Sequence, residues 1–227
     1  MNHDTYVIIP VYNEAKMVGS VIETVKKHYA NVVCVSDGSR DNSSDVIVTA
    51  GAYLVEHPIN FGAGAATQTG VDFALLDPKA KYFVTIDADG QHDVNDTLAM
   101  VALLRKGKYD VVFGSRFMGK VENISHFKFK FLQLATVFSK KTSGVNLSDP
   151  HIGLRAFNRT FAENLKITLH DFAHASEIIH RIDDGNYRYT ELPASVSYSD
   201  YSKSKGQSWI NAINITFDLW LHRMSKK

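Results

Sequence analysis

The sequence has few of the residues that stabilise secreted proteins or anchor membrane proteins. It contains one cysteine, Cys34, so no internal disulfide can form, and the valines around it are typical of a buried strand. No run of 18 uncharged apolar residues is present, and the N-terminus lacks the basic start and long apolar stretch of a signal peptide. We therefore expect a cytoplasmic protein whose contact with a membrane is peripheral.

Net charge is also small. The chain has 25 Lys and Arg residues against 24 Asp and Glu residues, and the resulting charge of +1 argues against a nucleic-acid partner. The charge is unevenly distributed, with 6 basic and 13 acidic residues in 1–104 but 12 basic and 4 acidic residues in 105–166. This division suggests an acidic part that binds a metal and a basic segment that binds an anion, although solvated surface helices would give the same counts.

Two phosphate-binding motifs are missing. No Walker sequence is present, and Gly62-Ala-Gly64 follows a loop and has Thr67 where a Rossmann fingerprint needs its third glycine. P-loop NTPases and NAD-dependent dehydrogenases are therefore disfavoured. With 227 residues, 44% of them apolar and 22% charged, the composition is that of a globular protein and favours one large domain.

Apolar strands alternate with helices in the first half of the chain. Strands that are apolar throughout and alternate with helices predict an α/β fold, with a mostly parallel sheet and helices on both faces. After residue 120 the alternation fades, but we still expect a single domain over 1–227. The predicted strands are 6–10, 31–36, 52–56, 82–86, 109–113, 153–157 and 187–192, and the predicted helices are 15–29, 43–50, 64–76, 93–105, 127–141, 175–182 and 206–223.

Two carboxylates follow the strand that ends at Ile86. Asp87 and Asp89 are two residues apart, and Gln91 follows them. Mg²⁺ and Mn²⁺ take oxygen ligands, use one or two protein carboxylates, and complete their shell with waters and substrate phosphates. Ligands of parallel sheets bind at the carboxyl ends of the strands, where this segment lies. The sequence therefore predicts a divalent-cation site with a diphosphate ligand.

The motifs after the strands occur together in a known family. The sequence resembles the family 2 inverting glycosyltransferases, which have the GT-A fold, and the resemblance covers residues 6–116 most strongly. Within that family it is similar to the dolichol-phosphate mannose synthase and polyprenyl-phosphate glycosyltransferase branch. The motifs are Pro10-Val-Tyr-Asn-Glu14, Ser36-Asp37-Gly-Ser39, Asp87-Ala-Asp-Gly-Gln91-His, Gly114-Ser-Arg116 and, for the branch, Gly153-Leu-Arg155.

The resemblance implies a role for each matching residue. Residues 1–118 would form the half that binds the nucleotide sugar, and 119–227 the acceptor half. Arg116 would face the acceptor and, with Asp89 and Asp149, would be catalytic. The resemblance implies nucleotide-sugar contacts from Pro10, Tyr12, Glu14, Asp37 and Asp87, and metal ligands from Asp87, Asp89 and Gln91. The positive charge of Arg116, Lys128, Lys130, Arg155 and Lys205 makes them candidates for acceptor contacts.

The implied reaction moves a sugar, with inversion, from a nucleoside-diphosphate donor to a polyprenyl phosphate or a polyprenyl-linked saccharide in cell-envelope glycan synthesis. A phosphate acceptor is already anionic at neutral pH and needs no base, so Arg116 and Arg155 would bind it. A hydroxyl acceptor on a growing cell-surface polysaccharide would need a general base, and Asp149 is the candidate. Because Pro150 favours an extended Asp149, the same segment also fits an ordinary turn.

The C-terminal segment 206–223 has an apolar stripe with two tryptophans and lysines on either side. Such a helix fits the surface of an anionic membrane, and it equally fits a core helix, a homo-oligomer contact or a contact with a membrane protein.

Two other classes of protein stay open. A nucleotidyltransferase would have a glycine-rich and basic triphosphate loop where this chain has Pro10-Val-Tyr-Asn-Glu14. A non-catalytic nucleotide-sugar-binding protein would keep the same motifs. Metal-dependent release of a nucleoside diphosphate would separate a glycosyltransferase from both.

Overall fold

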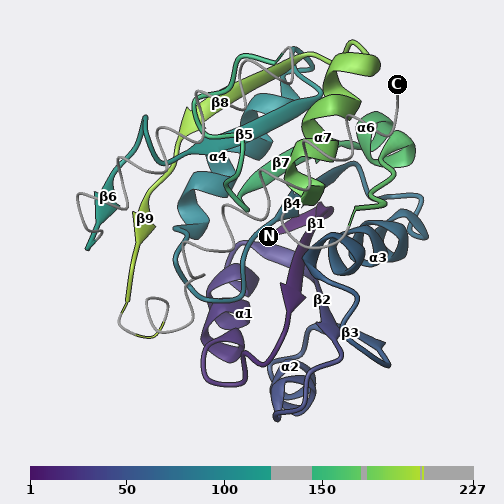
Figure 1. Cartoon of the computed structure of the whole chain (residues 1–227), viewed down its shortest axis with the longest axis vertical. Coiled ribbons are helices and arrows are strands. Elements are labelled where there is room, and N and C mark those ends of the chain that lie inside the picture. The colour runs from purple at the N-terminus through teal and green to yellow at the C-terminus, as the bar shows by residue number, and fades with distance from the viewer. Residues whose placement is uncertain (124–144, 170–172, 200, 202–227) are drawn as a thin grey trace.

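The computed structural model describes residues 1–123, 145–169, 173–199 and 201, which form a seven-stranded sheet between two layers of helices (Figure 1). The strand order is β3-β2-β1-β4-β7-β5-β8, and every pair is parallel except the two that β7 makes. The expected α/β fold with a mostly parallel sheet is confirmed. The strands are β1 (Asn2–Val11), β2 (Tyr29–Asp37), β3 (Tyr53–His57), β4 (Tyr82–Thr85), β5 (Val111–Ser115), β7 (Arg155–Asn158) and β8 (Tyr189–Pro193).

Helices cover both faces of this sheet because its strands are apolar on both sides. On one face, β-branched and aliphatic side chains of α1, α2 and α4 pack on the sheet, and on the other face α3, α6 and α7 do so (Figure 1). The helices are α1 (Val18–Lys26), α2 (Ser43–Thr49), α3 (Ala63–Leu75), α4 (Val94–Arg105), α6 (Arg159–Asn164) and α7 (Ala173–Asp184), and a separate ladder pairs β6 (Val121–Glu122) with β9 (Val196–Ser197).

Strand β7 runs against its two neighbours. Arg155 in β7 is paired with Thr85 at the end of β4 and with Phe113 in β5. The sequence predicts an extended segment here, but neither its direction nor its position between β4 and β5. This insertion brings the Gly153-Leu-Arg155 segment beside the residues that follow β4.

Two short features were not predicted. Helix α6 has six residues and begins where the Asn158 side chain accepts a hydrogen bond from Phe161 N at 2.9 Å. The β6–β9 ladder has two residues in each strand. Elements this short contain too few residues for a hydrophobic period to show.

Some predictions fall on residues that the structure does not describe. The predicted helices 127–141 and 206–223 lie outside the described residues, as do Lys128, Lys130 and Lys205. The division into halves at residue 118 therefore stays a prediction. Within the described ranges, no helix is both long enough and apolar enough to cross a bilayer.

Candidate functional site

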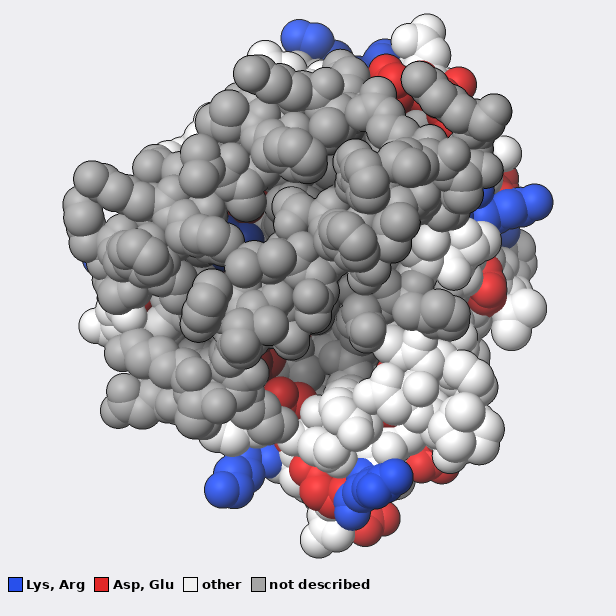
Figure 2. All heavy atoms as spheres, in the orientation of Figure 1, with Lys and Arg blue, Asp and Glu red and all other residues white. Residues whose placement is uncertain are grey.

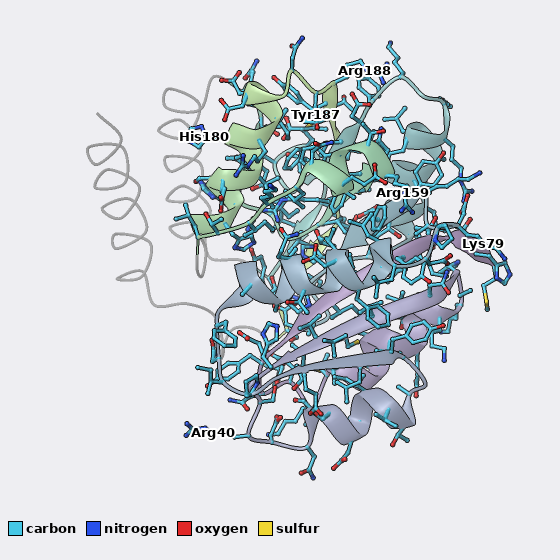
Figure 3. All side chains as sticks on the ribbon, turned by 90° about the vertical axis from the view of Figure 1, so that its right-hand side faces the viewer. Arg40, Lys79, Arg159, His180, Tyr187 and Arg188 are labelled. Atoms are coloured by element: carbon cyan, nitrogen blue, oxygen red, sulfur yellow. The ribbon has the colours of Figure 1, made fainter. Side chains whose placement is uncertain are left out.

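The sequence motifs meet at one edge of the sheet. Four of them lie at the carboxyl ends of the parallel strands β1, β2, β4 and β5, and Gly153-Leu-Arg155 lies at the start of the antiparallel strand β7. Figure 3 shows the two edges, with Arg40, which follows β2, on one side and Lys79, which precedes β4, on the other. Most acidic side chains visible in Figure 2 lie in the lower part of that view, where Figure 1 shows α1 and α2.

The loop after β1 is held by the loop after β2. Asn13 has a left-handed backbone, with φ of 53°, and its amide donates to Ser39 Oγ at 3.1 Å. In return, Asn13 Oδ1 accepts from Arg40 N at 2.7 Å, and Glu14 N donates to Ser43 Oγ at 2.8 Å. Sequence reasoning missed the two serines as supports of the first loop.

The predicted nucleotide-sugar residues of this loop differ in their surroundings. Tyr12 is 46% exposed, and Pro10 lies within β1, paired with Val35. Glu14 Oε2 accepts a hydrogen bond from the Tyr201 hydroxyl at 2.7 Å. The structure thus places Tyr12 where it can contact a ligand, while the role of all three residues in nucleotide-sugar binding stays a prediction.

Asp37 is buried, and both of its oxygens accept hydrogen bonds. Oδ1 accepts from Phe61 N at 2.9 Å, and Oδ2 accepts from Gly62 N at 2.8 Å. Oδ1 is also hydrogen-bonded to His57 Nδ1 at 2.7 Å, and His57 Nε2 is hydrogen-bonded to Thr69 Oγ1 at 2.9 Å. Asp37 therefore fixes the loop that leads into α3, a structural role that its motif did not indicate.

Asp87 lies at the end of β4 with one face open and the other against the backbone. Its side chain is 52% exposed, and Oδ2 is hydrogen-bonded to His92 Nε2 at 2.9 Å. A Cβ added at Gly153 would lie 2.3 Å from both Asp87 oxygens, so glycine is required there. Burial of its inner face opposes ionisation, but the His92 hydrogen bond and the charges of His92, Arg155 and Arg116 hold the pKa of Asp87 below its usual value.

The pKa of Asp89 is shifted in the opposite direction from that of Asp87. Burial, followed by repulsion from Asp87 and Glu14, raises its pKa to about 6, although it accepts hydrogen bonds from Gln91 N at 3.0 Å and Gln91 Nε2 at 2.5 Å. Two neighbouring carboxylates could supply oxygen ligands to a divalent cation. Among the described residues, no group of three or more metal-ligating side chains is arranged to hold a metal, so waters and a diphosphate would have to complete its shell.

Arg116, which follows β5, is paired with Asp149. Asp149 Oδ2 accepts from the Arg116 amide at 3.0 Å and from Arg116 Nε at 2.6 Å, and the Asp149 side chain is only 2% exposed. Arg116 Nη1 also donates to the Tyr198 hydroxyl at 3.2 Å. Burial lowers the pKa of Arg116, but the Asp149 charge outweighs it and the pKa is raised. The structure brings these two predicted catalytic residues together as an ion pair.

Arg155 and His151 lie beside this pair. Arg155 is 2% exposed, and its guanidinium lies over the Phe113 ring, 5.9 Å from the centroid. Its Nε has no hydrogen-bond partner among the described residues. Burial lowers the pKa of Arg155 to about 10, so it stays charged at neutral pH. Burial and the Arg155 charge lower the pKa of His151 to about 4, so its imidazole is neutral.

Several residues that support the site have only weak sequence signals. His92 follows the carboxylate motif directly, but a histidine in a loop is too common to be assigned a partner. Glu191 in β8 accepts hydrogen bonds from Ser148 N and Asp149 N, and nothing in the sequence distinguishes it from a surface carboxylate.

Comparison with known proteins identifies the family. The model of the family described as Glycosyl transferase family 2 matches residues 6–166. An uncharacterized protein of Methanocaldococcus jannaschii is 32% identical over 97% of this chain and 93% of its own. The UDP-N-acetylglucosamine–dolichyl-phosphate N-acetylglucosaminyltransferase of Methanococcus voltae is 28% identical over 97% of this chain and 96% of its own.

A solved structure shares the fold. Glucosyl-3-phosphoglycerate synthase of Mycobacterium tuberculosis, crystallised with Mn²⁺ and UDP-glucose, superimposes with a TM-score of 0.71 at 15% identity, covering 99% of this chain and 79% of that one. The resemblance seen in the motifs and the GT-A fold that it implied are confirmed. The chain is a glycosyltransferase and belongs to glycosyl transferase family 2.

Proposed function

We propose that this glycosyltransferase moves a sugar, with inversion, from a nucleoside-diphosphate donor to a polyprenyl phosphate in cell-envelope glycan synthesis. The observation that carries the proposal is the state of Asp149. A carboxylate with a 2% exposed side chain, bound to the backbone and side chain of Arg116, is not free to accept a proton from a sugar hydroxyl. The site is thus suited to an acceptor that needs no base.

The donor would bind over the ends of β1, β2 and β4. Asp87, Asp89 and Gln91 would hold Mg²⁺ or Mn²⁺, which, when bound, neutralises the charge of the leaving diphosphate. Tyr12, which is exposed in the loop after β1, would contact the nucleotide. The raised pKa of Asp89 supports this assignment because burial, followed by repulsion from Asp87 and Glu14, opposes its ionisation, and a bound cation would favour it.

The acceptor would bind on the side of β5 and β7. A phosphate monoester has a second pKa of about 6 and is mostly dianionic at neutral pH, so it can attack the anomeric carbon without losing a proton. Arg116 would bind this anion, because its guanidinium is 13% exposed and its planar fork matches phosphate oxygens. Arg155 adds a second, more deeply buried charge.

The relatives support a lipid-linked acceptor. Besides the enzyme of Methanococcus voltae, a dolichyl-phosphate hexose transferase of Haloferax volcanii is 28% identical over 84% of this chain. We propose that this protein likewise acts at the cytoplasmic face of a membrane, with Lys128, Lys130 and Lys205 as further acceptor contacts and segment 206–223 on the membrane surface or on a protein partner.

The test is a panel of nucleotide sugars with Mn²⁺ or Mg²⁺, in which nucleoside diphosphate release is measured with and without polyprenyl phosphate. We expect release that requires metal, one donor and the lipid phosphate. Arg116→Lys should reduce it strongly, because an ammonium cannot reproduce the fork that binds Asp149 and phosphate. Arg188→Lys is the matched control, because Arg188 pairs with Asp110 at the opposite edge of the sheet (Figure 3).

The other outcomes are equally informative. Release only with a saccharide acceptor would refute the phosphate acceptor and would return Asp149 to the role of base. The Asp149→Asn variant cannot decide this alone, because it also removes the partner of Arg116. A nucleotidyltransferase would show no release in this panel but would release pyrophosphate from a nucleoside triphosphate and a sugar phosphate. Donor binding without turnover in either assay would indicate a non-catalytic nucleotide-sugar-binding protein.

A further inference from the structure

Glu191 in β8 is a partly buried carboxylate surrounded by hydrogen-bond donors. Ser148 N donates to its two oxygens at 2.8 and 2.7 Å, and Ser148 Oγ donates to Oε1 at 2.9 Å. Asp149 N donates to Oε1 at 3.0 Å. A carboxylate that accepts several bonds from one short segment restrains the backbone of that segment. The position of the 148–149 peptide is therefore fixed by one side chain of the edge strand.

The same peptide is tied to the end of β5. Ser148 Oγ lies 2.5 Å from Ser115 Oγ, and Ser115 is paired with Pro193 in the parallel ladder of β5 and β8. Ser115 directly precedes Arg116. The peptide thus bridges the ends of two neighbouring strands, one of which leads into Arg116.

Asp149 transmits this restraint to the guanidinium. Its Oδ2 accepts from both the Arg116 backbone amide and Arg116 Nε. Because the Asp149 side chain is 2% exposed, water cannot readily replace either donor. Any movement of the 148–149 peptide would therefore change the direction in which Arg116 points.

We propose that Glu191 is a positioning residue for Arg116 and acts through Asp149. The proposal rests on the proposed function only in that Arg116 there binds the acceptor. A carboxylate is required because Ser148 N donates to both oxygens, so a glutamine turned either way would place its amide NH₂ group against that donor.

The first test does not depend on activity. Arg116 Nε makes a short, charge-assisted hydrogen bond, so its N–H signal in a ¹H–¹⁵N spectrum should be shifted downfield and exchange slowly. Arg116→Lys, which lacks this signal, assigns it. Glu191→Gln should move the signal toward those of exposed arginines, and a signal superimposable on that of the wild type would overturn the proposal.

Tyr189→Phe is the matched control. Tyr189 lies on the same strand and accepts from Asn146 N at 3.0 Å, so it supports the same segment without contacting the residues that hold Arg116. The Arg116 signal should survive this change. If Tyr189→Phe and Glu191→Gln shift the signal equally, Glu191 does not position Arg116 and the proposal is wrong.

The second test separates positioning from general stability. In the transfer assay, Glu191→Gln should raise KM for polyprenyl phosphate by about tenfold or more and leave KM for the donor unchanged. In an Arg116→Lys background it should have no further effect on the acceptor KM. Equal increases in both KM values would refute the proposal. If the wild type does not use polyprenyl phosphate, the proposed function fails, and the spectrum still decides the role of Glu191.

Discussion

Replacing Gly153 with alanine should displace the Asp87 carboxylate. The new Cβ would lie 2.3 Å from both carboxylate oxygens, whereas ordinary contacts begin at 3.4 Å, so the carboxylate must move by roughly 1 Å. Because 52% of the Asp87 side chain is exposed, it can move outward, and the free energy of unfolding should fall by only about 1 kcal/mol. A catalytic group misplaced by about 1 Å costs on the order of 100-fold in rate.

Two assays test this prediction. Mn²⁺ binding is monitored by the electron paramagnetic resonance signal of the free ion, and activity is measured as metal-dependent release of the nucleoside diphosphate. We expect Gly153→Ala to weaken Mn²⁺ binding and to lower release on the order of 100-fold. Gly107→Ala is the control, because Gly107 has φ of 69° and nothing near its Cβ position, so this change strains the backbone away from the site. Wild-type metal binding in Gly153→Ala would refute the placement of Asp87 against Gly153.

Three further predictions follow from the buried groups. Asp149→Asn should lower the free energy of unfolding by about 3–5 kcal/mol in urea, because Arg116 is left buried without its anion, and a change below about 1 kcal/mol would contradict the ion pair. His57→Phe should cost about 1–3 kcal/mol in the same assay, because Asp37 loses one of three donors; an unchanged midpoint would show that this bond is unimportant. The pKa of His151 is lowered to about 4 in the folded protein, so its imidazole is neutral there. Its contribution to the free energy of unfolding is therefore complete above pH 6.5, and it is lost as the pH falls toward 4 because the unfolded chain binds the proton first. Unfolding free energies measured from pH 7 to 4 should therefore fall more steeply in the wild type than in His151→Asn, and parallel curves would exclude a lowered pKa.

The first half of the fold could be predicted because its signals are local. Each strand of β1 to β4 is an apolar run followed by a helix with an amphipathic period, and the structure places every one of them within a few residues of the expected position. Asp93 precedes α4 and caps it, because its side chain accepts from Asn95 N at 2.9 Å. A cap and a period depend on neighbours in the sequence, so one chain is enough to read them.

The second half depends on contacts between distant residues. Nothing in the period of 153–157 shows that β7 runs antiparallel between β4 and β5, because a strand has the same apolar pattern in either direction. Glu191 lies 42 residues from Asp149, and its role exists only because β8 is next to β5. The motifs indicated the chemistry of the site, and the long-range pairing of strands determines which residues support it.

The two carboxylates that follow β4 show why residue type alone cannot assign roles within the site. Asp87 and Asp89 are the same residue two positions apart, yet the pKa of Asp87 is lowered and that of Asp89 is raised to about 6. The difference arises because burial raises both pKa values, but at Asp87 it is outweighed by the His92 hydrogen bond and the charges of His92 and Arg155. At Asp89 burial dominates, and the charges of Asp87 and Glu14 add to it. Ionisation is therefore opposed more strongly at Asp89 than at Asp87, and a cation bound between the two carboxylates would favour the ionised form of Asp89 most.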